Sequence, residues 1–389
     1  NYYISIRAID HSGNTSATAV SDGITVDAVD PSVTSLFEGS TNEDLDYQQN
    51  SNQLSIAWSG SDATTRAITG YLVCLGTSAG DTNIVDWTEV GNTTTYTFEG
   101  LSLNEGITYY ASAQAQDQAG NVSDILTGDG ITIDQSGPTT GQINDGDGED
   151  IDWVNINYLA LGNWTGFFDS LSGIAEYEYS LGLTSGGTQV VNWTSSGSDT
   201  SITVNISLTE GPSYYASVRA IDSVGNVGAH ISSDGFGLDQ SAPVSGTVID
   251  GFETDQIWTN STDSLNASWS GFSDQYSGID FYEYAIGSSA GGQEIVSWTN
   301  TDTSTEITHD RLNMTHDTTY YFSVRATDIV GFVSEPDTAN GITVDTIPPV
   351  INPISEAAEY DPLFQGSDTT VTLYWNALDA LSGIDYYEY

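Results

Sequence analysis

Apolar and polar residues alternate along a short segment that occurs four times in the chain. In the copy YYASVRAIDSVGN every second residue from the first tyrosine faces one way and is apolar, which is the period of a strand with one buried face. The Asp-x-x-Gly-Asn ending predicts a turn, because Gly adopts positive φ and Asp and Asn side chains bond the local backbone. The leading tyrosines are 107, 105 and 106 residues apart: Tyr2, Tyr109, Tyr214 and Tyr320.

A fixed period of this length indicates a tandem repeat. Short alternating segments with frequent turn signals and no helical period predict about seven strands per repeat, arranged as a β-sandwich. Each repeat closes with an aspartate four residues before a proline, and because proline cannot continue a central strand, these prolines mark junctions. The predicted domains are a truncated C-terminal part at 1–30, complete domains at 31–137, 138–242 and 243–348, and a truncated N-terminal part at 349–389.

The truncated ends lead us to expect a longer natural polypeptide, since half a sandwich cannot bury a core or satisfy its strand edges. The chain has 389 residues, and each complete repeat contains about 106 of them. We therefore interpret the sequence as a segment of a much longer array, whose total number of repeats cannot be deduced from it.

The charge balance is extreme. The chain has 54 acidic residues, five arginines and no lysine, for a formal net charge of −49. Such a surface repels nucleic-acid phosphates and anionic lipid heads, so we expect no nucleic-acid binding. The sequence has no run of 18 apolar residues, so we expect no membrane insertion. The acidic surface suits a salty medium, where screening shortens the self-repulsion, or one that supplies divalent cations. With Cys74 as the single cysteine, no disulfide can form within the chain.

Catalytic constellations are not visible in the sequence. The four histidines occupy positions that do not correspond between repeats, and no cysteine or further ligand accompanies them. No glycine-rich phosphate loop precedes a predicted helix, because no helix is predicted. We therefore expect no enzymatic activity and no catalytic or organic-cofactor site.

Residues at fixed positions in each repeat carry a resemblance. A tryptophan ends the second strand, a tyrosine lies in the third, and a leucine-bearing loop precedes the motif tyrosine, as in LSLNEGITYY. Together these features resemble a fibronectin type III domain. The resemblance implies an all-β tandem array of fibronectin-III/Ig-like β-sandwich domains, with core tryptophans Trp58, Trp164, Trp269 and Trp375 and tyrosine corners at Tyr109, Tyr214 and Tyr320.

The Asp- and Thr-rich composition of the array also resembles giant secreted bacterial adhesins and extracellular filament proteins. That resemblance implies an extracellular or cell-surface location and a mechanical function as a stalk, filament or adhesin segment that mediates attachment to cells or surfaces. Expected partners are other copies of the chain in a filament or bundle, and a distal cell-surface or glycan ligand bound through regions outside this segment. An S-layer or sheath protein is one alternative, and some of the chain's Asn-x-Ser/Thr sequons would then carry glycans.

The other alternative is a carbohydrate-binding array attached to a secreted hydrolase. A second set of recurring tryptophans bears on it: Trp87, Trp193 and Trp298. We interpret them as core or lid residues near a strand edge. Two coplanar exposed tryptophans would instead indicate a platform for stacking sugars.

The few arginines predict specific ion pairs. In the second and third complete repeats an arginine faces outward on the motif strand, and a glutamate lies between the tyrosines of the strand expected to neighbour it. We predict the cross-strand pairs Glu178–Arg219 and Glu283–Arg325. As surface pairs each should contribute only about 0–1 kcal/mol. The first complete repeat lacks both charged residues at these positions.

Acidic residues recur where repeats meet. In this fold the end of the last strand faces the next repeat, whose loop after the second strand and turn after the motif strand face back. We therefore expect Asp134 to approach Asp169 and Asp222, and Asp239 to approach Asp274 and Asp328. Four acids lie fourteen residues before the core tryptophans: Asp44, Asp150, Asp255 and Asp361. Of these, we expect Asp150 and Asp255 at the end of the repeat shared with the following unit.

Converging carboxylates repel one another unless a cation lies between them. Ca²⁺ accepts six to eight oxygen ligands at about 2.3–2.6 Å and tolerates irregular loops, which suits such junctions better than Mg²⁺. The sequence therefore predicts junction calcium sites built from the eight aspartates expected there. The competing interpretation is that these acids form a solvated surface screened by salt alone.

Overall fold

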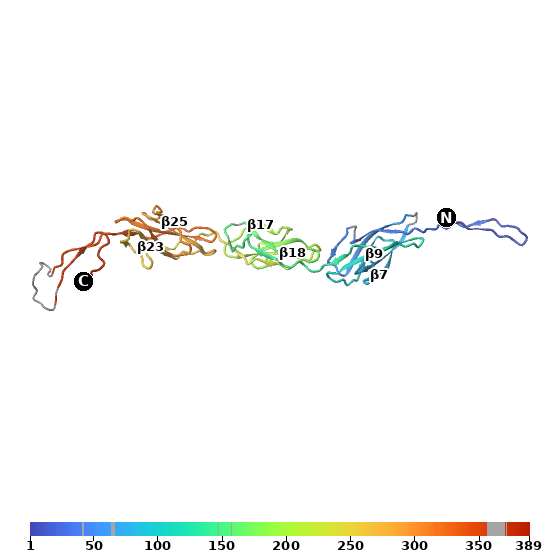
Figure 1. Ribbon diagram of the computed structural model, residues 1–389, viewed down its shortest axis with the longest axis horizontal. Coiled ribbons are helices and arrows are strands. Elements are labelled where there is room, and N and C mark those ends of the chain that lie inside the picture. The colour runs from blue at the N-terminus through green and yellow to red at the C-terminus, as the bar shows by residue number, and fades with distance from the viewer. Residues whose placement is uncertain (41–42, 64–66, 147, 157, 356–369, 371) are drawn as a thin grey trace. The chain divides into compact units, whose positions relative to one another are not determined.

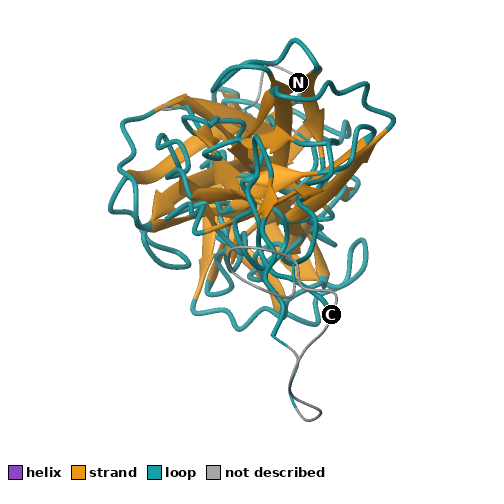
Figure 2. Ribbon diagram, turned by 90° about the vertical axis from the view of Figure 1, so that its left-hand side faces the viewer, coloured by secondary structure: helices purple, strands orange, loops and turns teal. Residues whose placement is uncertain are grey.

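The protein is described by a computed structural model covering residues 1–40, 43–63, 67–146, 148–156, 158–355, 370 and 372–389. Every described element is a strand or a loop (Figure 2), which agrees with the all-β prediction. Over these residues the search for a helix long and apolar enough to cross a membrane finds no candidate. Asp361 lies outside the described residues.

The first complete repeat forms two sheets. β3, β5 and β8 make a three-stranded sheet in that order, while β4, β11, β9, β6 and β7 make the other, with β10 paired to β9. In Figure 1, β7 and β9 mark this sandwich. Its strands are β3 (Ser32–Glu38), β4 (Tyr47–Gln48), β5 (Gln53–Ser61), β6 (Ile68–Gly76), β7 (Val85–Gly91), β8 (Thr95–Glu99), β9 (Thr108–Asp117), β10 (Leu126–Thr127) and β11 (Ile131–Ile133).

The second and third repeats have the same strand order, and Figure 1 labels β17 and β18 in the second and β23 and β25 in the third. The second contains β12 (Gln142–Asn144), β13 (Trp153–Val154), β14 (Tyr158–Thr165), β15 (Ile174–Gly182), β16 (Val191–Gly197), β17 (Ser201–Asn205), β18 (Ser213–Asp222), β19 (Ile231–Ser232) and β20 (Phe236–Leu238). The third contains β21 (Thr247–Asp250), β22 (Trp258–Thr259), β23 (Ser264–Ser270), β24 (Ile279–Gly287), β25 (Val296–Asn300), β26 (Glu306–Asp310), β27 (Thr319–Asp328), β28 (Asp337–Thr338) and β29 (Ile342–Val344).

Each terminal segment contains one two-stranded antiparallel sheet in the part that the structure describes. β1 (Ser5–Ile6) pairs with β2 (Ala19–Val20), and β30 (Val350–Ile351) pairs with β31 (Ala377–Leu378). By internal contacts the chain divides into two compact units, with the division inside the second repeat. Unit 1 is Asn1–Gly148, Ala160–Ile202 and Tyr215–Asp234, and unit 2 is Glu149–Leu159, Thr203–Tyr214 and Gly235–Tyr389.

The first strand of each repeat changes sheets part-way along its path. β3 pairs antiparallel with β5, whereas β4 pairs parallel with β11 in the opposite sheet. β21 and β22 repeat this pattern, pairing with β23 and β29 respectively. The connection between the two halves must therefore cross from one sheet to the other, and it lies beside the start of the last strand.

The apolar face of the alternating strands forms each core. Trp58 is 4 % exposed and meets Tyr71 edge-on, with 5.5 Å between ring centroids. Trp269 meets Tyr282 in the same way at 5.8 Å. Burying one such aromatic side chain contributes about 1.5–3 kcal/mol. The predicted core position of the second-strand tryptophan is thus confirmed in the complete repeats, including Trp164 at 1 % exposed.

The tyrosine corners are also present. The buried Tyr109 hydroxyl accepts a hydrogen bond from the Asn104 amide, 2.8 Å away. The Tyr320 hydroxyl accepts one from the amide of Thr315 at 3.2 Å, and the corresponding bond joins Tyr214 to the loop before it. Each tyrosine therefore ties the start of the motif strand to the leucine-bearing loop.

Both predicted ion pairs form. Glu178 lies directly opposite Arg219 between β15 and β18, with 2.6 Å between Glu Oε2 and Arg Nη2. The third repeat repeats the geometry with Glu283 and Arg325 at 2.7 Å. Each guanidinium also lies over a half-buried tryptophan, 4.4 Å from the ring centroid of Trp193 in the second repeat. Trp193 and Trp298 thus each cover an arginine side chain. This arrangement is similar to the lid role that the sequence suggests for them.

Candidate metal centre

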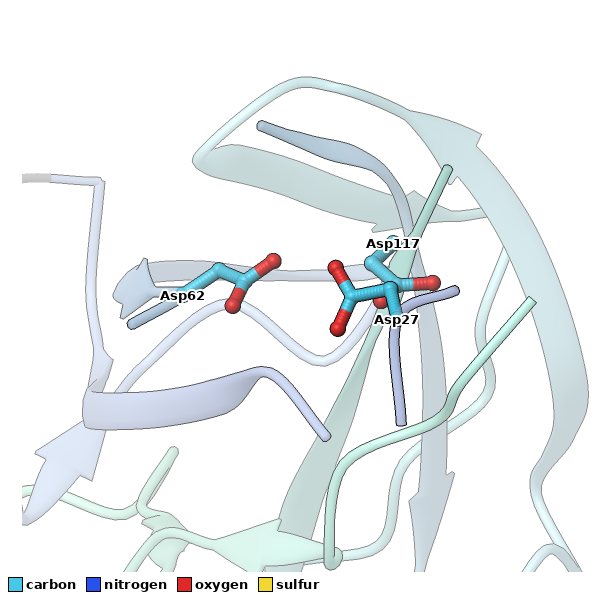
Figure 3. Close-up of side chains that lie close together, drawn as sticks. All are labelled: Asp27, Asp62 and Asp117. Atoms are coloured by element: carbon cyan, nitrogen blue, oxygen red, sulfur yellow. The ribbon is translucent and has the colours of Figure 1, made fainter. Parts of the chain in front are cut away.

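Three aspartates meet at each of three junctions between successive repeats in the part of the chain that the structure describes. In unit 1, Asp134 follows β11, Asp169 lies in the loop between β14 and β15, and Asp222 ends β18. One carboxylate oxygen from each lies within 4.8 Å of the other two. Figure 3 shows the preceding junction, where the carboxylates of Asp27, Asp62 and Asp117 point toward one another. The third group lies within unit 2: Asp239, Asp274 and Asp328.

Backbone hydrogen bonds fix the loop aspartate of the second and third groups. Asp169 Oδ1 accepts bonds from the amides of Leu171 and Gly173, which folds the loop around its own carboxylate. The amide of Ser172, from the same loop, donates to Asp134 Oδ2 at 3.1 Å. The last strand of one repeat is therefore hydrogen-bonded to a loop of the next, as the sequence predicts for these residues.

The turn after the motif strand supplies a second link. Asp222 Oδ1 accepts the amide of Asn226, and the Asn226 side chain closes the turn by donating to Asp222 Oδ2 at 2.7 Å. The same Nδ2 also donates to the backbone oxygen of Asp134 at 3.0 Å. Asn226 is 5 % exposed, so these bonds are shielded from water. The asparagine therefore bridges two of the three junction aspartates.

The third junction repeats the loop but not the bridge. The Ser277 amide donates to Asp239 Oδ2 at 3.1 Å, as Ser172 does to Asp134. Phe332 occupies the position of the asparagine, and its amide donates to Asp328 Oδ1 at 2.8 Å. Asp328 Oδ2, in a residue only 1 % exposed, has no hydrogen-bond partner among the described residues. Burial raises the pKa of Asp328, and the charges of Asp239 and Asp274 raise it further.

A fourth junction is partly formed at the end of the described chain. The Ser382 amide donates to Asp345 Oδ2 at 3.2 Å. Asp379 Oδ1 accepts the amides of Leu381 and Gly383, as Asp169 does in its own loop. The aspartate at the strand end and the loop around the next aspartate therefore recur at the second, third and fourth junctions.

The possible metal ligands at these junctions fit a hard divalent cation. All three side chains in each group are carboxylates, and neither histidine nor cysteine joins them in the groups found among the described residues. Oxygen-only ligands favour Ca²⁺ or Mg²⁺ over zinc or copper, and irregular loops favour Ca²⁺. The unpartnered Asp328 oxygen is the clearest sign of fit, because a buried charged oxygen without a donor is costly.

The sequence predicts Asp150 and Asp255 at the end of the repeat that meets the following one. For Asp255 this prediction is wrong. Its carboxylate does not join a junction group: Oδ1 accepts the Asp250 amide at 3.1 Å, and Oδ2 accepts the Asn340 side chain at 2.6 Å. The loop bearing Asp255 carries the chain from one sheet to the other beside β29, so it lies along the side of the sandwich. Asp150 is exposed in the corresponding loop between β12 and β13, and it is not in the Asp239 group at the junction with the following repeat.

Sequence reasoning missed the acids at this change of sheets. Glu38, the last residue of β3, is fully buried, and one of its oxygens lies within 4.8 Å of carboxylate oxygens of Asp44 and Asp129. Burial raises the pKa of Glu38 to about 7, and Asp44 and Asp129 add to the rise. The available signal was an acid at the end of the first strand of each repeat or directly after it, nineteen or twenty residues before the core tryptophan: Glu38, Asp145 and Asp250.

The cysteine and two of the histidines have structural environments. Burial raises the pKa of Cys74 to about 11, which keeps its thiol protonated. His309 Nδ1 lies 2.6 Å from the hydroxyl of Tyr284, a core residue. His316 Nδ1 accepts the amide of Thr346 at 3.2 Å. Burial thus accounts for the cysteine and local contacts for the two histidines, and His316 Nδ1 also lies 3.6 Å from Oδ1 of the junction residue Asp345.

Comparison with known proteins gives limited sequence similarity. No family model matches the chain. Exoglucanase B of Cellulomonas fimi is 28 % identical over 232 residues, which is 58 % of this chain but only 19 % of the exoglucanase. The chain therefore corresponds to about a fifth of that protein's length.

The comparison with solved structures finds tandem β-sandwich proteins that match the chain at low sequence identity. The chicken CNTN1 FN1-FN3 domains are 12 % identical, covering 81 % of this chain and 97 % of that one, with a TM-score of 0.30. Domains A168-A170 from titin are 15 % identical, covering 82 % and 100 %, with a TM-score of 0.34. The fibronectin(III)-like modules of Clostridium thermocellum CbhA are 15 % identical, covering 53 % and 94 %, at 0.29. By its own strand order and tyrosine corners, the chain consists of tandem fibronectin type III-like β-sandwiches.

Proposed function

We propose that this chain is a mechanical spacer within a secreted extracellular repeat protein, and that calcium joins its repeats. The observation that carries the proposal is the recurrence of three converging aspartates at successive junctions. In the second and third groups one aspartate directly follows the last strand of a repeat, and the other two belong to the next repeat, one in a loop and one at the end of the motif strand. A ligand held by all three therefore connects neighbouring repeats directly.

Electrostatics supports a bound cation. Three ionised carboxylates within 4.8 Å repel one another, and partial burial weakens the screening that water would give. A divalent cation turns this repulsion into attraction and satisfies the Asp328 oxygen that lacks a donor among the described residues. Because the aspartates belong to different repeats, binding restrains the junction and stabilises the folded repeats by mass action.

In this proposal the chain is part of an extracellular stalk, filament or adhesin. Extracellular calcium-binding modules work at dissociation constants of about 10⁻⁴–10⁻³ M. The net charge of −49 keeps copies apart unless cations are present. Divalent cations would therefore also favour association with other copies of the chain, while a distal region would bind the cell-surface or glycan ligand.

A second candidate is a non-catalytic spacer array within a secreted hydrolase. The match to an exoglucanase favours it, although that match covers a minor part of the enzyme. In this case the same junctions would set the distance between a catalytic domain and a carbohydrate-binding domain. Retention of the 389-residue chain on insoluble cellulose would favour this candidate, and calcium-dependent self-association in sedimentation would favour the filament.

The test of junction calcium uses the full 389-residue chain. Thermal unfolding and small-angle scattering are recorded with millimolar Ca²⁺ and then with chelator, at matched ionic strength. We expect calcium to raise the melting temperature and to narrow the distribution of particle dimensions. The variant Asp239→Asn should lose part of the response, whereas Asp280→Asn, which removes an exposed charge from β24, should retain it. An unchanged melting temperature and scattering curve would contradict the proposal.

A further inference from the structure

A second kind of acidic site lies in the first complete repeat, away from the junction aspartates. We name it the crossover site and define it by Glu38, Asp44 and Asp129. Glu38 ends β3, Asp44 lies in the loop toward β4, and Asp129 precedes β11 by two residues. These are the elements between which the first strand changes sheets. The site thus joins the two sheets of one repeat, whereas each junction group joins two repeats.

The carboxylate of Glu38 is buried and unsatisfied. The residue is 0 % exposed, and neither Oε1 nor Oε2 has a hydrogen-bond partner of acceptable geometry within the described part of the chain. Its backbone amide donates to Asp44 Oδ1 at 2.9 Å, which holds the second carboxylate beside the first. Carboxylate oxygens of Glu38, Asp44 and Asp129 lie within 4.8 Å of one another. A buried anion beside two more carboxylates is strongly unfavourable unless something positive compensates it.

Close packing directs the Glu38 carboxylate into this position. A Cβ atom added to Gly128 would lie 2.1 Å from Glu38 Oε1, so only glycine leaves room for the carboxylate there. The Ala111 amide is close enough to oppose the rise in the pKa of Glu38, yet it does not form a hydrogen bond of acceptable geometry. The carboxylate is therefore tightly packed, and none of the described residues donates a hydrogen bond to it.

The third repeat offers an internal comparison. Asp250 is fully buried at the equivalent position, and its Oδ2 accepts the Gly341 amide at 3.0 Å. Asn340 takes the position of Asp129, and its Nδ2 donates to Asp255 Oδ2 at 2.6 Å. The amide thus donates to the second acid of the set, whereas Asp250 Oδ1, like both Glu38 oxygens, has no hydrogen-bond partner among the described residues. The two crossovers therefore differ in the exchange of Asp129 for Asn340, in the exchange of Glu38 for Asp250, and in the backbone amide that Asp250 accepts.

We propose that the crossover site of the first repeat binds a calcium ion through Glu38, Asp44 and Asp129. All three ligands are hard oxygens from loops or strand ends, without histidine or cysteine in the group, which favours Ca²⁺ over transition metals. The ion would hold the strand crossover against the start of β11, the role that Asn340 has in the third repeat. This proposal does not depend on calcium at the junctions.

The test is a calorimetric titration of the chelator-treated 389-residue chain with CaCl₂ at fixed ionic strength. Asp129→Asn gives the first repeat the acid–acid–amide set of the third, and we expect one equivalent of bound calcium to be lost or weakened at least tenfold. N340D gives the third repeat a third acid, and we expect one equivalent to be gained. Asp124→Asn, which removes an exposed charge near Asp129, should bind as the unchanged chain does.

These variants separate the crossover site from the junction sites. Asp129, Asn340 and Asp124 are not members of the junction groups, so junction binding contributes equally to every titration. An unaltered stoichiometry and affinity in a folded Asp129→Asn chain would overturn the proposal. If circular dichroism shows that this variant is unfolded, N340D decides: a gained equivalent supports the site, and an unchanged stoichiometry overturns it.

Discussion

The second and third junctions have three aspartates at equivalent positions, but they differ in the residue four positions after the last of these aspartates. Asn226 donates to Asp222 Oδ2 and to the backbone oxygen of Asp134. Phe332, at the same position, can donate to neither through its side chain, and Asp328 Oδ2 has no partner among the described residues. One junction is thus connected by an amide, whereas the other leaves a buried carboxylate oxygen unsatisfied.

The difference shows how a cation and a side-chain amide can perform the same task. Both provide positive charge density to a carboxylate, and both connect residues of neighbouring repeats. Where asparagine is present, its side chain already connects the two repeats. We therefore expect the stability of such a junction to depend less on calcium. The crossover of the third repeat follows the same logic, since Asn340 donates to Asp255.

The largest effect should come from removing the bridge. Asn226→Ala deletes two buried hydrogen bonds, one of them to a charged group, and should destabilise the second repeat by about 2–3 kcal/mol in chelator. Phe332→Ala removes only a half-buried ring and should cost about 1 kcal/mol. Native-state hydrogen exchange followed by mass spectrometry measures each repeat separately. Similar losses in the two variants would show that the asparagine is not a bridge.

A smaller effect should come from the opposite exchange. In Phe332→Asn the new amide can donate to Asp328 Oδ2, so we expect the raised pKa of Asp328 to fall and the third repeat to gain about 1 kcal/mol at neutral pH. The first repeat is the precedent. There burial opposes the charged form of Asp117, yet the side chain of Asn121 and the turn amides lower its pKa below the usual range.

The pH dependence should change sign with this exchange. A folded-state pKa raised by burial means that the native chain holds the proton more tightly, so the penalty from Asp328 is present at high pH and is relieved as pH falls through that pKa. With a lowered pKa, stability would instead be lost on acidification. Carboxyl ¹³C NMR titration in chelator follows Asp328 directly. Ile329→Asn, in the same turn but 57 % exposed, is the control and should leave the titration unchanged.

The smallest effect should be equal in the two repeats. Glu178→Gln and Glu283→Gln each break an ion pair of the same geometry on the sandwich surface, and each should cost about 0–1 kcal/mol. Added salt should reduce both losses, because the pairs are partly exposed. Hydrogen exchange of the paired strands measures them. A large difference between the two would mean that the repeats differ in more than their junctions, which would weaken the comparison.

The sequence was sufficient for features that depend on local period and on pairing between neighbouring strands. Alternation and turn residues predicted the strands, the repeated tryptophan predicted the core, and opposed charges predicted Glu178–Arg219. The order of strands in such a sandwich then brought Asp134 to Asp169 and Asp222. Their proximity followed from topology, and the cation between them stays a prediction.

The tertiary structure alone decided which acids are buried. Glu38 and Asp44 belong to a run of acids that, in sequence, has the pattern of a solvated loop. The change of sheets between β3 and β4 turns Glu38 inward and brings Asp129, 91 residues away in the chain, beside it. Burial and the approach of distant charges set the pKa of a carboxylate and its need for a partner. Neither quantity is encoded in local sequence, because both arise only when separate strands pack together.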